Sequence, residues 1–225
     1  MATPLPQILS NLHAAAVAAG RPDPRLLAVS KTQPAEAVAA LAAQGQHAFG
    51  ENYVQEALAK MQVLQHLALE WHLIGHLQSN KADAVASHFD WVQSVDRLKL
   101  VTALARHRPA ARGPLNVLIQ VNIDDESSKH GCAPDEVDAL AAAIAAEPGL
   151  RLRGLMAIPA PWPEAERRRD AFVRMRTLFQ TLAAQYAQVD TLSMGMSGDY
   201  ADAIVEGATL VRIGTALFGA RPRPA

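Results

Sequence analysis

Cysteine is almost absent from this sequence of 225 residues, which contains only Cys132. One thiol cannot form a disulfide within the chain, and such sequences are typical of reducing compartments. We therefore expect a cytoplasmic protein. No flanking motif marks Cys132 as an activated nucleophile, so we interpret it as a small packing residue.

Long hydrophobic runs are also missing. No uninterrupted apolar stretch approaches the roughly 20 residues that cross a bilayer. Near the N-terminus the apolar residues are interrupted by Pro4, Pro6, Asn11 and His13, and no basic residue precedes Arg21. This segment resembles neither a signal peptide nor a membrane anchor. We expect no membrane association.

The sequence has no excess of charge of either sign. Lys and Arg total 21 against 22 Asp and Glu, which gives a net charge of −1. Proteins that bind nucleic acids or anionic membranes usually carry a basic excess. The densest basic stretch, residues 164–176, interleaves arginines with acidic residues and is typical of a solvated helix face. The charge therefore argues against nucleic-acid partners.

Two motifs of common cofactor and metal sites are missing. The first strand–helix turn lacks G-x-G-x-x-G, which argues against a dinucleotide-binding open sheet. His72 and His76, in WHLIGH, lack the Glu of H-E-x-x-H. They fall on a predicted strand, where they would lie about 13 Å apart. The sequence predicts no metal site.

What the sequence contains is a regular alternation of short apolar runs with Ala-rich helical segments. This order predicts an α/β fold, a single (β/α)8 barrel over residues 1–225 with an extra N-terminal helix at residues 4–19. The alternative is a doubly wound open sheet. The predicted strands are 26–31, 48–51, 71–75, 91–95, 115–122, 152–158, 191–195 and 210–214.

Lys31 ends the first predicted strand, in the stretch LLAVSKTQP. Function in such barrels gathers at the carboxyl ends of the strands. One interpretation is a lysine that extends from a strand end with its ammonium in water. The other is a lysine in a partly desolvated barrel opening, where desolvation lowers the lysine pKa and leaves the amine free to attack a carbonyl.

Residues 192–219 favour the second interpretation. Strand seven ends at Met194 and Gly195, and Ser197 and Gly198 precede a helix whose free N–H groups attract an anion. Strand eight ends in Arg212-Ile213-Gly214-Thr215, again with a glycine and a hydroxyl. Loops after strands seven and eight often bind phosphate in these barrels. The alternative for Ser197 is an ordinary helix N-cap.

A lysine and a phosphate site at one barrel mouth indicate a phosphorylated aldehyde held as a Schiff base. Pyridoxal 5'-phosphate fits best, since it needs these two groups and a partner for its ring nitrogen. Arg212 is the only charged residue of its strand and could face that nitrogen. Because arginine keeps its proton, the ring nitrogen would stay unprotonated and the cofactor would be a weak electron sink.

The chain resembles the YggS/PROSC family of pyridoxal phosphate homeostasis proteins. The resemblance lies in AVSKTQP, FGENYVQE, WHLIGHLQSNK, SVDR, VNIDDESSKHG, GLMAIP and LSMGMSGDYADAIVEGATLVRIGTALFG. It implies a barrel like the N-terminal domain of alanine racemase, with pyridoxal phosphate on Lys31. The cofactor-binding residues that it implies, together with the patterns above, are Lys31, Asn52, Lys129, Met194, Ser197, Gly198, Arg212, Gly214 and Thr215.

Two further positions follow from this resemblance. Lys129, in the N-x-x-x-E-x-x-K-x-G pattern of residues 122–131, corresponds to a second lysine implicated in cofactor handling. Gln33 replaces a basic residue that relatives often carry, which removes a positive charge near the mouth.

The resemblance implies a protein that binds, buffers and delivers pyridoxal phosphate, without known turnover. Its expected partners are the cofactor and pyridoxal-phosphate-dependent apo-enzymes. We expect a monomer, because no long exposed apolar stripe is readable in the sequence.

Two other functions remain open at this stage. A racemase would need a second proton-transfer group opposite Lys31, and the nearby candidates are Tyr53, Tyr200 and Cys132. We interpret both tyrosines as packing residues. The third possibility is a cofactor-free barrel of the phosphosugar isomerase type.

Overall fold

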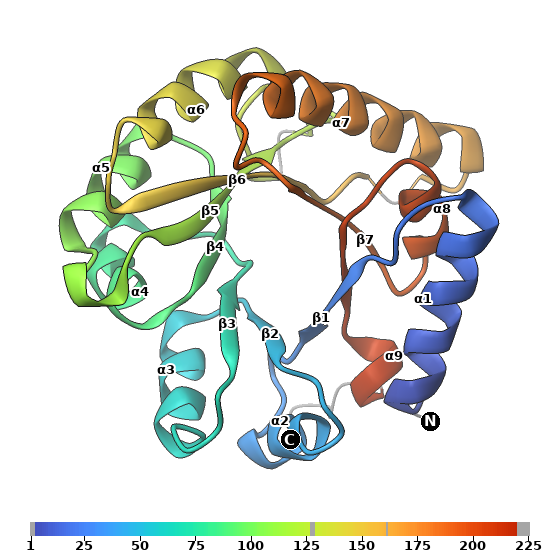
Figure 1. Ribbon diagram of the computed structural model, residues 1–225, viewed down its shortest axis with the longest axis horizontal. Coiled ribbons are helices and arrows are strands. Elements are labelled where there is room, and N and C mark those ends of the chain that lie inside the picture. Colours follow the sequence, from blue (N-terminus) through green and yellow to red (C-terminus); the bar gives the residue numbers. More distant parts are fainter. Residues whose placement is uncertain (1–2, 127–128, 161, 220–225) are drawn as a thin grey trace.

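The strands of the protein close into a barrel. The computed structural model describes residues 3–126, 129–160 and 162–219. Its parallel strands pair in chain order (Figure 1). The predicted (β/α)8 barrel is confirmed, and the open sheet is wrong because β8 also pairs with β1. The strands are β1 (Arg25–Val29), β2 (Ala48–Glu51), β3 (Glu70–Leu73), β4 (Trp91–Val95), β5 (Leu115–Val121), β6 (Leu150–Ala157), β7 (Thr191–Met196) and β8 (Leu210–Ile213).

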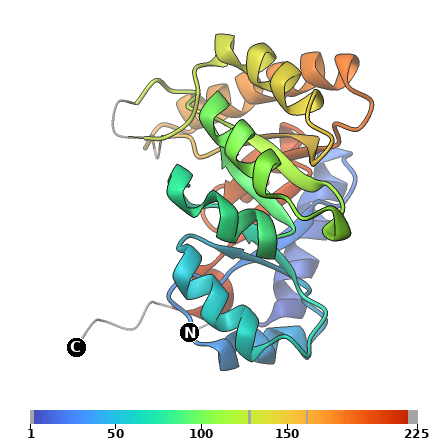
Figure 2. The ribbon, with the colours of Figure 1, turned by 90° about the vertical axis from the view of Figure 1, so that its left-hand side faces the viewer.

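Helices form the outer layer around the strands, as the side view in Figure 2 also shows. The α-helices are α1 (Leu5–Ala19), α2 (Ala35–Ala42), α3 (Val54–Val63), α4 (Ala82–His88), α5 (Leu98–His107), α6 (Val137–Ala145), α7 (Ala165–Gln185), α8 (Tyr200–Val205) and α9 (Thr215–Phe218). Short 3-10 turns occur at η1 (Ser79–Lys81), η2 (Ala110–Arg112) and η3 (Pro134–Glu136). Across the described residues, no helix combines the length and apolar content needed to cross a bilayer.

Helix α1 is the predicted extra N-terminal helix, and it packs beside α8 (Figure 1). Its buried side chains recur every three or four residues, at Leu5, Ile8, Leu12 and Ala16. This spacing places them on one helix face. After the helix, the Arg21 guanidinium donates to the carbonyl oxygen of Val205 at 3.2 Å. The extra helix is thereby fixed to the end of α8.

β1, β3, β5, β6 and β8 end one or two residues earlier than the sequence predicts, β2 and β4 end as predicted, and β7 ends one residue later. β1 ends at Val29 instead of Lys31, because the Gln33 amide donates to the Ser30 carbonyl at 3.0 Å and closes a turn. β2, β4 and β8 are buried along their whole length, as expected for parallel strands covered on both faces.

The basic stretch of residues 164–176 lies in the first half of α7, and its arginines do more than face solvent. Arg169 and Arg176 both form ion pairs with Glu206, which is buried. Arg174 pairs with Asp124 at 2.6 Å. Most of residues 164–170 are exposed, as expected for a solvated face, but these ion pairs were not predicted, because Glu206 and Asp124 lie far from α7 in the sequence.

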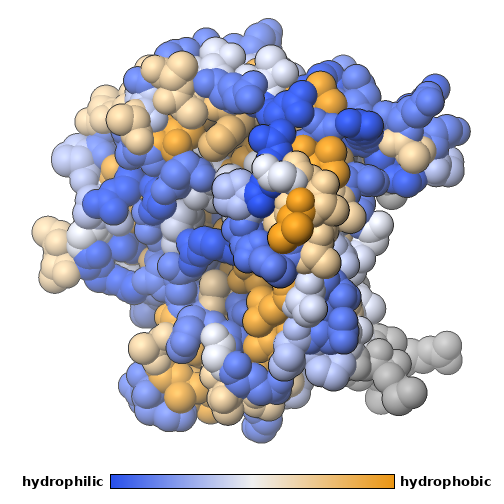
Figure 3. Space-filling view, turned by 45° about the vertical axis from the view of Figure 1, so that its right-hand side comes forward, coloured by the Kyte–Doolittle hydropathy of each residue, from blue (hydrophilic) through white to orange (hydrophobic). Residues whose placement is uncertain are grey.

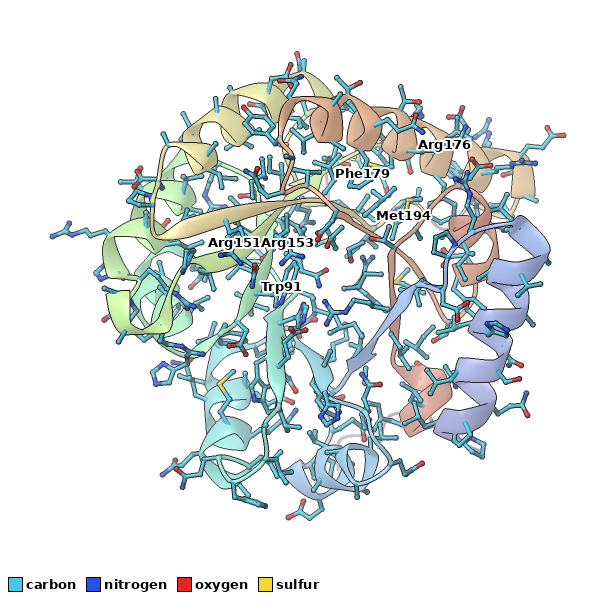
Figure 4. The ribbon with its side chains drawn as sticks, in the orientation of Figure 1. Trp91, Arg151, Arg153, Arg176, Phe179 and Met194 are labelled. Carbon is cyan, nitrogen blue, oxygen red and sulfur yellow. The ribbon has the colours of Figure 1, made fainter. Side chains whose placement is uncertain are left out.

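The barrel interior is filled below the mouth by side chains from several strands. Trp91 contacts Leu118 and Met156 in one buried cluster. Its ring stacks on His72 with centroids 5.1 Å apart, and the Arg153 guanidinium lies 4.7 Å from the Trp91 ring centroid (Figure 4). The interior around Trp91 is therefore a packed core.

Candidate functional site

A cavity of about 290 Å³ opens at the carboxyl ends of the strands, close to the lower limit of about 300 Å³ for small-molecule pockets. Its walls combine polar groups with apolar side chains. The lining residues are Val29, Lys31, Gln33, Asn52, Ile74, Ile158, Met196, Ser197, Gly198, Arg212, Gly214, Thr215 and Gly219. The structure therefore brings together every predicted site residue except Met194 and Lys129.

Lys31 stands on the turn that directly follows β1. The Ser30 amide still donates to the Gly50 carbonyl of β2 at 3.0 Å. Two residues later Thr32 has a φ of 64°, a left-handed conformation that is strained for a β-branched residue. The Thr32 amide is held by the Glu56 carboxylate at 2.6 Å. The surrounding protein thus fixes a backbone conformation that the local sequence does not favour.

A buried lysine organises this turn from below. Lys60 of α3 donates to the carbonyl oxygen of Ser30 at 2.7 Å and to Glu51 Oε1 at 2.7 Å. It also donates to Glu56 Oε1 at 2.6 Å. The Ser30 hydroxyl donates to Glu51 Oε1 at 2.6 Å. One ammonium therefore joins the end of β2, the start of α3 and the backbone that carries Lys31.

The network was not predicted from the sequence. The side chain of Glu51 is fully buried. Burial raises the pKa of Glu51, against the hydrogen bonds from Lys60 and Ser30. A signal was available, because Glu56 and Lys60 have the i,i+4 spacing of a helical ion pair and Glu51 ends a predicted strand.

Arg212 projects from β8 into the same cavity and is 3% exposed. Its Nη1 donates to the Ser193 hydroxyl at 2.7 Å, and its Nη2 donates to the Ala157 carbonyl at 2.7 Å. No carboxylate among the described residues forms an ion pair with it at these distances. Burial lowers the pKa of Arg212 to about 10, so the guanidinium remains charged at neutral pH. A fixed cation faces the cavity.

The hydrogen bonds of Arg212 continue through the barrel interior. The Ser193 hydroxyl donates to Gln93 Oε1 at 2.7 Å, and Gln93 Nε2 lies 2.9 Å from His72 Nδ1. His72 Nε2 lies 2.7 Å from Glu70 Oε1. This network assigns a neutral His72 that accepts at Nδ1 and donates at Nε2. The chain of bonds therefore links the cavity to the opposite end of the barrel.

The loop after β7 forms a compact turn with free amides. Asp199 precedes α8 and its Oδ1 accepts from the Met196 amide at 2.6 Å. Ser197 is therefore not the N-cap of this helix. Among the described residues, none accepts a hydrogen bond from the backbone amides of Ser197 and Gly198. These donors are available to an anion in the cavity.

Three glycines lie at or just after the ends of β7 and β8. A Cβ at Gly198 would meet no atom within 4 Å, so it would extend into free space of the cavity wall. Gly195 has a φ of 91°, and a Cβ there would lie 2.6 Å from the Cβ of Ala203. Gly214 precedes α9, whose first amide, on Thr215, lies outside the helical hydrogen bonds.

Lys129 lies on the rim of a neighbouring cavity. Its ammonium donates to the carbonyl oxygens of Ile158 and Pro159 at 3.2 and 3.1 Å and pairs with Glu126 at 2.6 Å. The neighbouring cavity shares Asn52, Ile74 and Ile158 with the first. Lys129 is thus placed beside the Lys31 cavity and does not line it.

Met194 belongs to the hydrophobic core and does not line the cavity. Ser193 points into the barrel, so the adjacent Met194 points toward the helices, and Figure 4 shows it turned away from the barrel centre. Met196 occupies the cavity wall instead. The register between β7 and β8 shifts beyond Ser193. The inward–outward alternation of side chains along β7 is interrupted there, so the sequence alone does not identify Met196 as a cavity residue.

The three side chains considered as a second proton-transfer group for a racemase lie in different surroundings. Tyr200 packs against the core as expected, but Tyr53 is 59% exposed and is not a packing residue. Tyr53 is the N-cap residue of α3, and it lines a pocket together with Asn52. Burial, with the nearby carboxylates of Glu136 and Asp96, raises the pKa of the Cys132 thiol to about 12, which agrees with a passive thiol.

Comparisons with known proteins agree with this geometry. The family described as "Alanine racemase, N-terminal domain" matches residues 4–222. Among curated proteins, the Pyridoxal phosphate homeostasis protein of Pseudomonas aeruginosa is 55% identical over 218 residues, covering 96% of this chain and 93% of the relative. That of Escherichia coli K12 is 53% identical over 222 residues, covering 96% and 95%. The chain belongs to the family of pyridoxal phosphate homeostasis proteins.

A solved protein structure has a similar fold. PipY of Synechococcus elongatus, solved with PLP bound, matches with a TM-score of 0.81 and 37% identity. The match covers 94% of this chain and 100% of PipY. The sequence resemblance to the homeostasis family is thereby confirmed.

Proposed function

We propose that this protein binds pyridoxal 5'-phosphate as a Schiff base on Lys31 and buffers or delivers it, without catalytic turnover. The observation that carries the proposal is the single cavity that holds the Lys31 turn, the Arg212 cation and the loops after β7 and β8. Relatives more than 50% identical are named as pyridoxal phosphate homeostasis proteins, which supports it.

Each group of the cofactor has a matching group in the protein. Lys31 supplies the amine that condenses with the aldehyde carbon and releases water. The amides of Ser197 and Gly198, with Gly214 and Thr215, bind the phosphate as hydrogen-bond donors and a close-approach backbone. Asn52 lies beside the ring. Lys129, on the rim, acts in cofactor exchange.

Arg212 determines how the bound cofactor behaves. When bound, pyridoxal phosphate supplies an electron sink whose strength depends on protonation of its ring nitrogen. The Arg212 guanidinium keeps its own proton and can only donate, so it holds the ring nitrogen unprotonated. A weak sink suits storage better than turnover. Gln33, on the cavity wall, is neutral where relatives often carry a basic residue, and this loss of positive charge near the mouth alters cofactor exchange.

The remaining expectations form part of the same proposal. We place the protein in the cytoplasm, as one domain over residues 1–225, of which residues 1–2, 127–128, 161 and 220–225 lie outside the described residues. We propose a monomer that transfers cofactor to apo-enzymes. In support, hydrophilic side chains cover most of the face in Figure 3, and apolar ones occur there in small groups.

The test is an absorption spectrum of the purified protein before and after borohydride reduction, with peptide mapping of the modified lysine. We expect a cofactor band and, after reduction, a mass increase on the Lys31 peptide. Lys31→Ala should lose the adduct, and Lys99→Ala, at an exposed lysine of α5, should keep it. An unchanged adduct on Lys31→Ala would refute the assignment.

A second measurement separates storage from racemisation. The loaded protein is incubated with L-alanine in deuterated water, and the α-proton is followed by NMR. Storage predicts no exchange above that of free pyridoxal phosphate. Exchange that requires Lys31 would favour an enzyme, formation of D-alanine would then identify a racemase, and Tyr53→Phe would test the exposed tyrosine as the second base.

A further inference from the structure

Three metal-ligating side chains converge on the barrel rim beside the proposed cofactor cavity. His76 follows β3, Asp96 follows β4, and His130 lies in the loop between β5 and α6. One ligand atom from each lies within 4.8 Å of those of the other two. His76 Nδ1 is 4.0 Å from Asp96 Oδ2. The set combines three consecutive segments of the barrel rim.

The two imidazole rings are stacked, with centroids 3.7 Å apart and planes at 16°. Each ring carries a nitrogen that can bind a metal ion, and one such atom from each lies within 4.8 Å of the other and of an Asp96 oxygen. The stacked contact therefore holds both imidazoles at the same point of the rim.

The carboxylate of Asp96 is oriented for a ligand role. Its Oδ1 accepts from Arg97 Nη1 at 2.5 Å, while Oδ2 faces His76. Arg97 is itself held by the Leu77 carbonyl at 2.8 Å. One oxygen is fixed by Arg97, and the other is directed toward the two histidines.

The loop that carries His130 is braced against β5. The Gln120 side chain donates to the His130 carbonyl at 2.9 Å. Val121 and Cys132 pair through their backbones in an isolated parallel β-bridge. Gly131 has a φ of 128°, and a Cβ there would lie 2.6 Å from the amide nitrogen of Asn122. Because glycine permits this close approach, the loop packs against the end of β5, which positions His130 at the rim.

We propose that His76, Asp96 and His130 bind a divalent transition-metal ion of the zinc class. Two imidazoles and one carboxylate suit such an ion, whereas Mg²⁺ and Ca²⁺ prefer sets of oxygen ligands. Bonds of about 2.1 Å place tetrahedral ligands about 3.4 Å apart, so ligand atoms that lie within 4.8 Å of one another must approach by up to about 1.4 Å, and the stacked rings must turn until their nitrogen lone pairs converge on the ion. His76 and His130 are exposed enough to rotate.

The three residues leave a coordination position for water or a small ligand. His76 and His130 also line the cavity that contains Lys129 and shares Asn52 with the Lys31 cavity. The ion would therefore lie next to the cofactor mouth and join the Lys129 loop to the ends of β3 and β4.

Calorimetric titration of the tag-free, chelator-treated full chain with Zn²⁺ tests this proposal. We expect one ion per chain, with affinity at least about ten-fold weaker in His130→Ala and in Asp96→Asn, since even indirect partners of a metal are worth 10- to 100-fold. His107→Ala is the matched control, because His107 Nδ1 lies 3.7 Å from Asp83 outside the site. It should bind like the parent.

Lys31→Ala distinguishes this site from the cofactor, which can itself chelate metals. The proposal predicts unchanged zinc affinity in Lys31→Ala, and tetrahedral visible bands when Co²⁺ replaces Zn²⁺. Zinc binding that is lost in Lys31→Ala, unaffected in His130→Ala, or absent from the parent would overturn it.

Discussion

The ammonium nitrogen of Lys60 lies 2.7 Å from the carbonyl oxygen of Ser30, the residue directly before Lys31. A second lysine, buried and paired with Glu51, thus sets the backbone from which the proposed cofactor lysine projects. The backbone position of Lys31 therefore depends on the Lys60–Glu51 ion pair, although neither of these two residues lines the cavity.

Replacing Lys60 with methionine should destabilise the protein by about 3–5 kcal/mol, because it leaves the Glu51 carboxylate buried without its cation. Urea denaturation measures this loss. Lys99→Met, at an exposed position of α5, is the control. The Glu51→Gln/Lys60→Met double variant should recover part of the stability. A loss below about 1 kcal/mol for Lys60→Met would contradict a structural role.

Replacing Arg212 with glutamate should change the bound cofactor's absorption spectrum and raise its reactivity toward amines. A carboxylate facing the ring nitrogen would favour its protonated form, which strengthens the electron sink. Arg212→Gln removes the cation without adding a carboxylate and separates the two effects. Identical spectra and amine reactivity in Arg212→Glu and the parent would exclude Arg212 as the ring partner.

The stability of the protein should fall as the pH drops below about 6.5. Burial lowers the pKa of His72 from its ordinary value of 6.5, against the hydrogen bond and charge of Glu70. Below that pH the unfolded chain binds a proton that the folded chain does not. The free energy of unfolding then decreases by up to about 1.4 kcal/mol per pH unit.

Urea titrations between pH 7.5 and 5 measure this slope. His72→Gln should reduce it, and His66→Gln, at an exposed position, should leave it intact. Equal slopes in the parent and His72→Gln would show that His72 takes up a proton inside the fold.

Lys129→Ala should change cofactor release more than equilibrium loading, since Lys129 lies on the rim and not in the Lys31 cavity. Stopped-flow transfer of cofactor to an apo-enzyme measures release, and equilibrium absorbance measures loading. Lys99→Ala is the control. A loading defect as large as the release defect would place Lys129 in direct contact with the cofactor.

The fold and most of the cavity could be predicted because they follow from local patterns. The order of short apolar runs and helices gives the barrel, and its strand ends place Lys31, Arg212 and Thr215 at one mouth. The Lys60 network was signalled only by the i,i+4 spacing of Glu56 and Lys60, and its other partners, Ser30 and Glu51, come from the turn after β1 and from β2. The His76–Asp96–His130 cluster depends on which loops meet at the rim. That contact is set by turn geometry, such as the φ of 128° at Gly131, and no linear spacing encodes it.

The hydrogen bonds between Arg212 and Glu70 all have the same polarity. From Arg212 Nη1 through Ser193, Gln93 and His72, each donor in this row points toward the Glu70 carboxylate. Glu70 in turn pairs with Arg25 at the partly solvent-accessible base of the barrel. The row thereby connects the wall of the cavity to the opposite end of the barrel, and loss of the Glu70 carboxylate would remove the acceptor at its end.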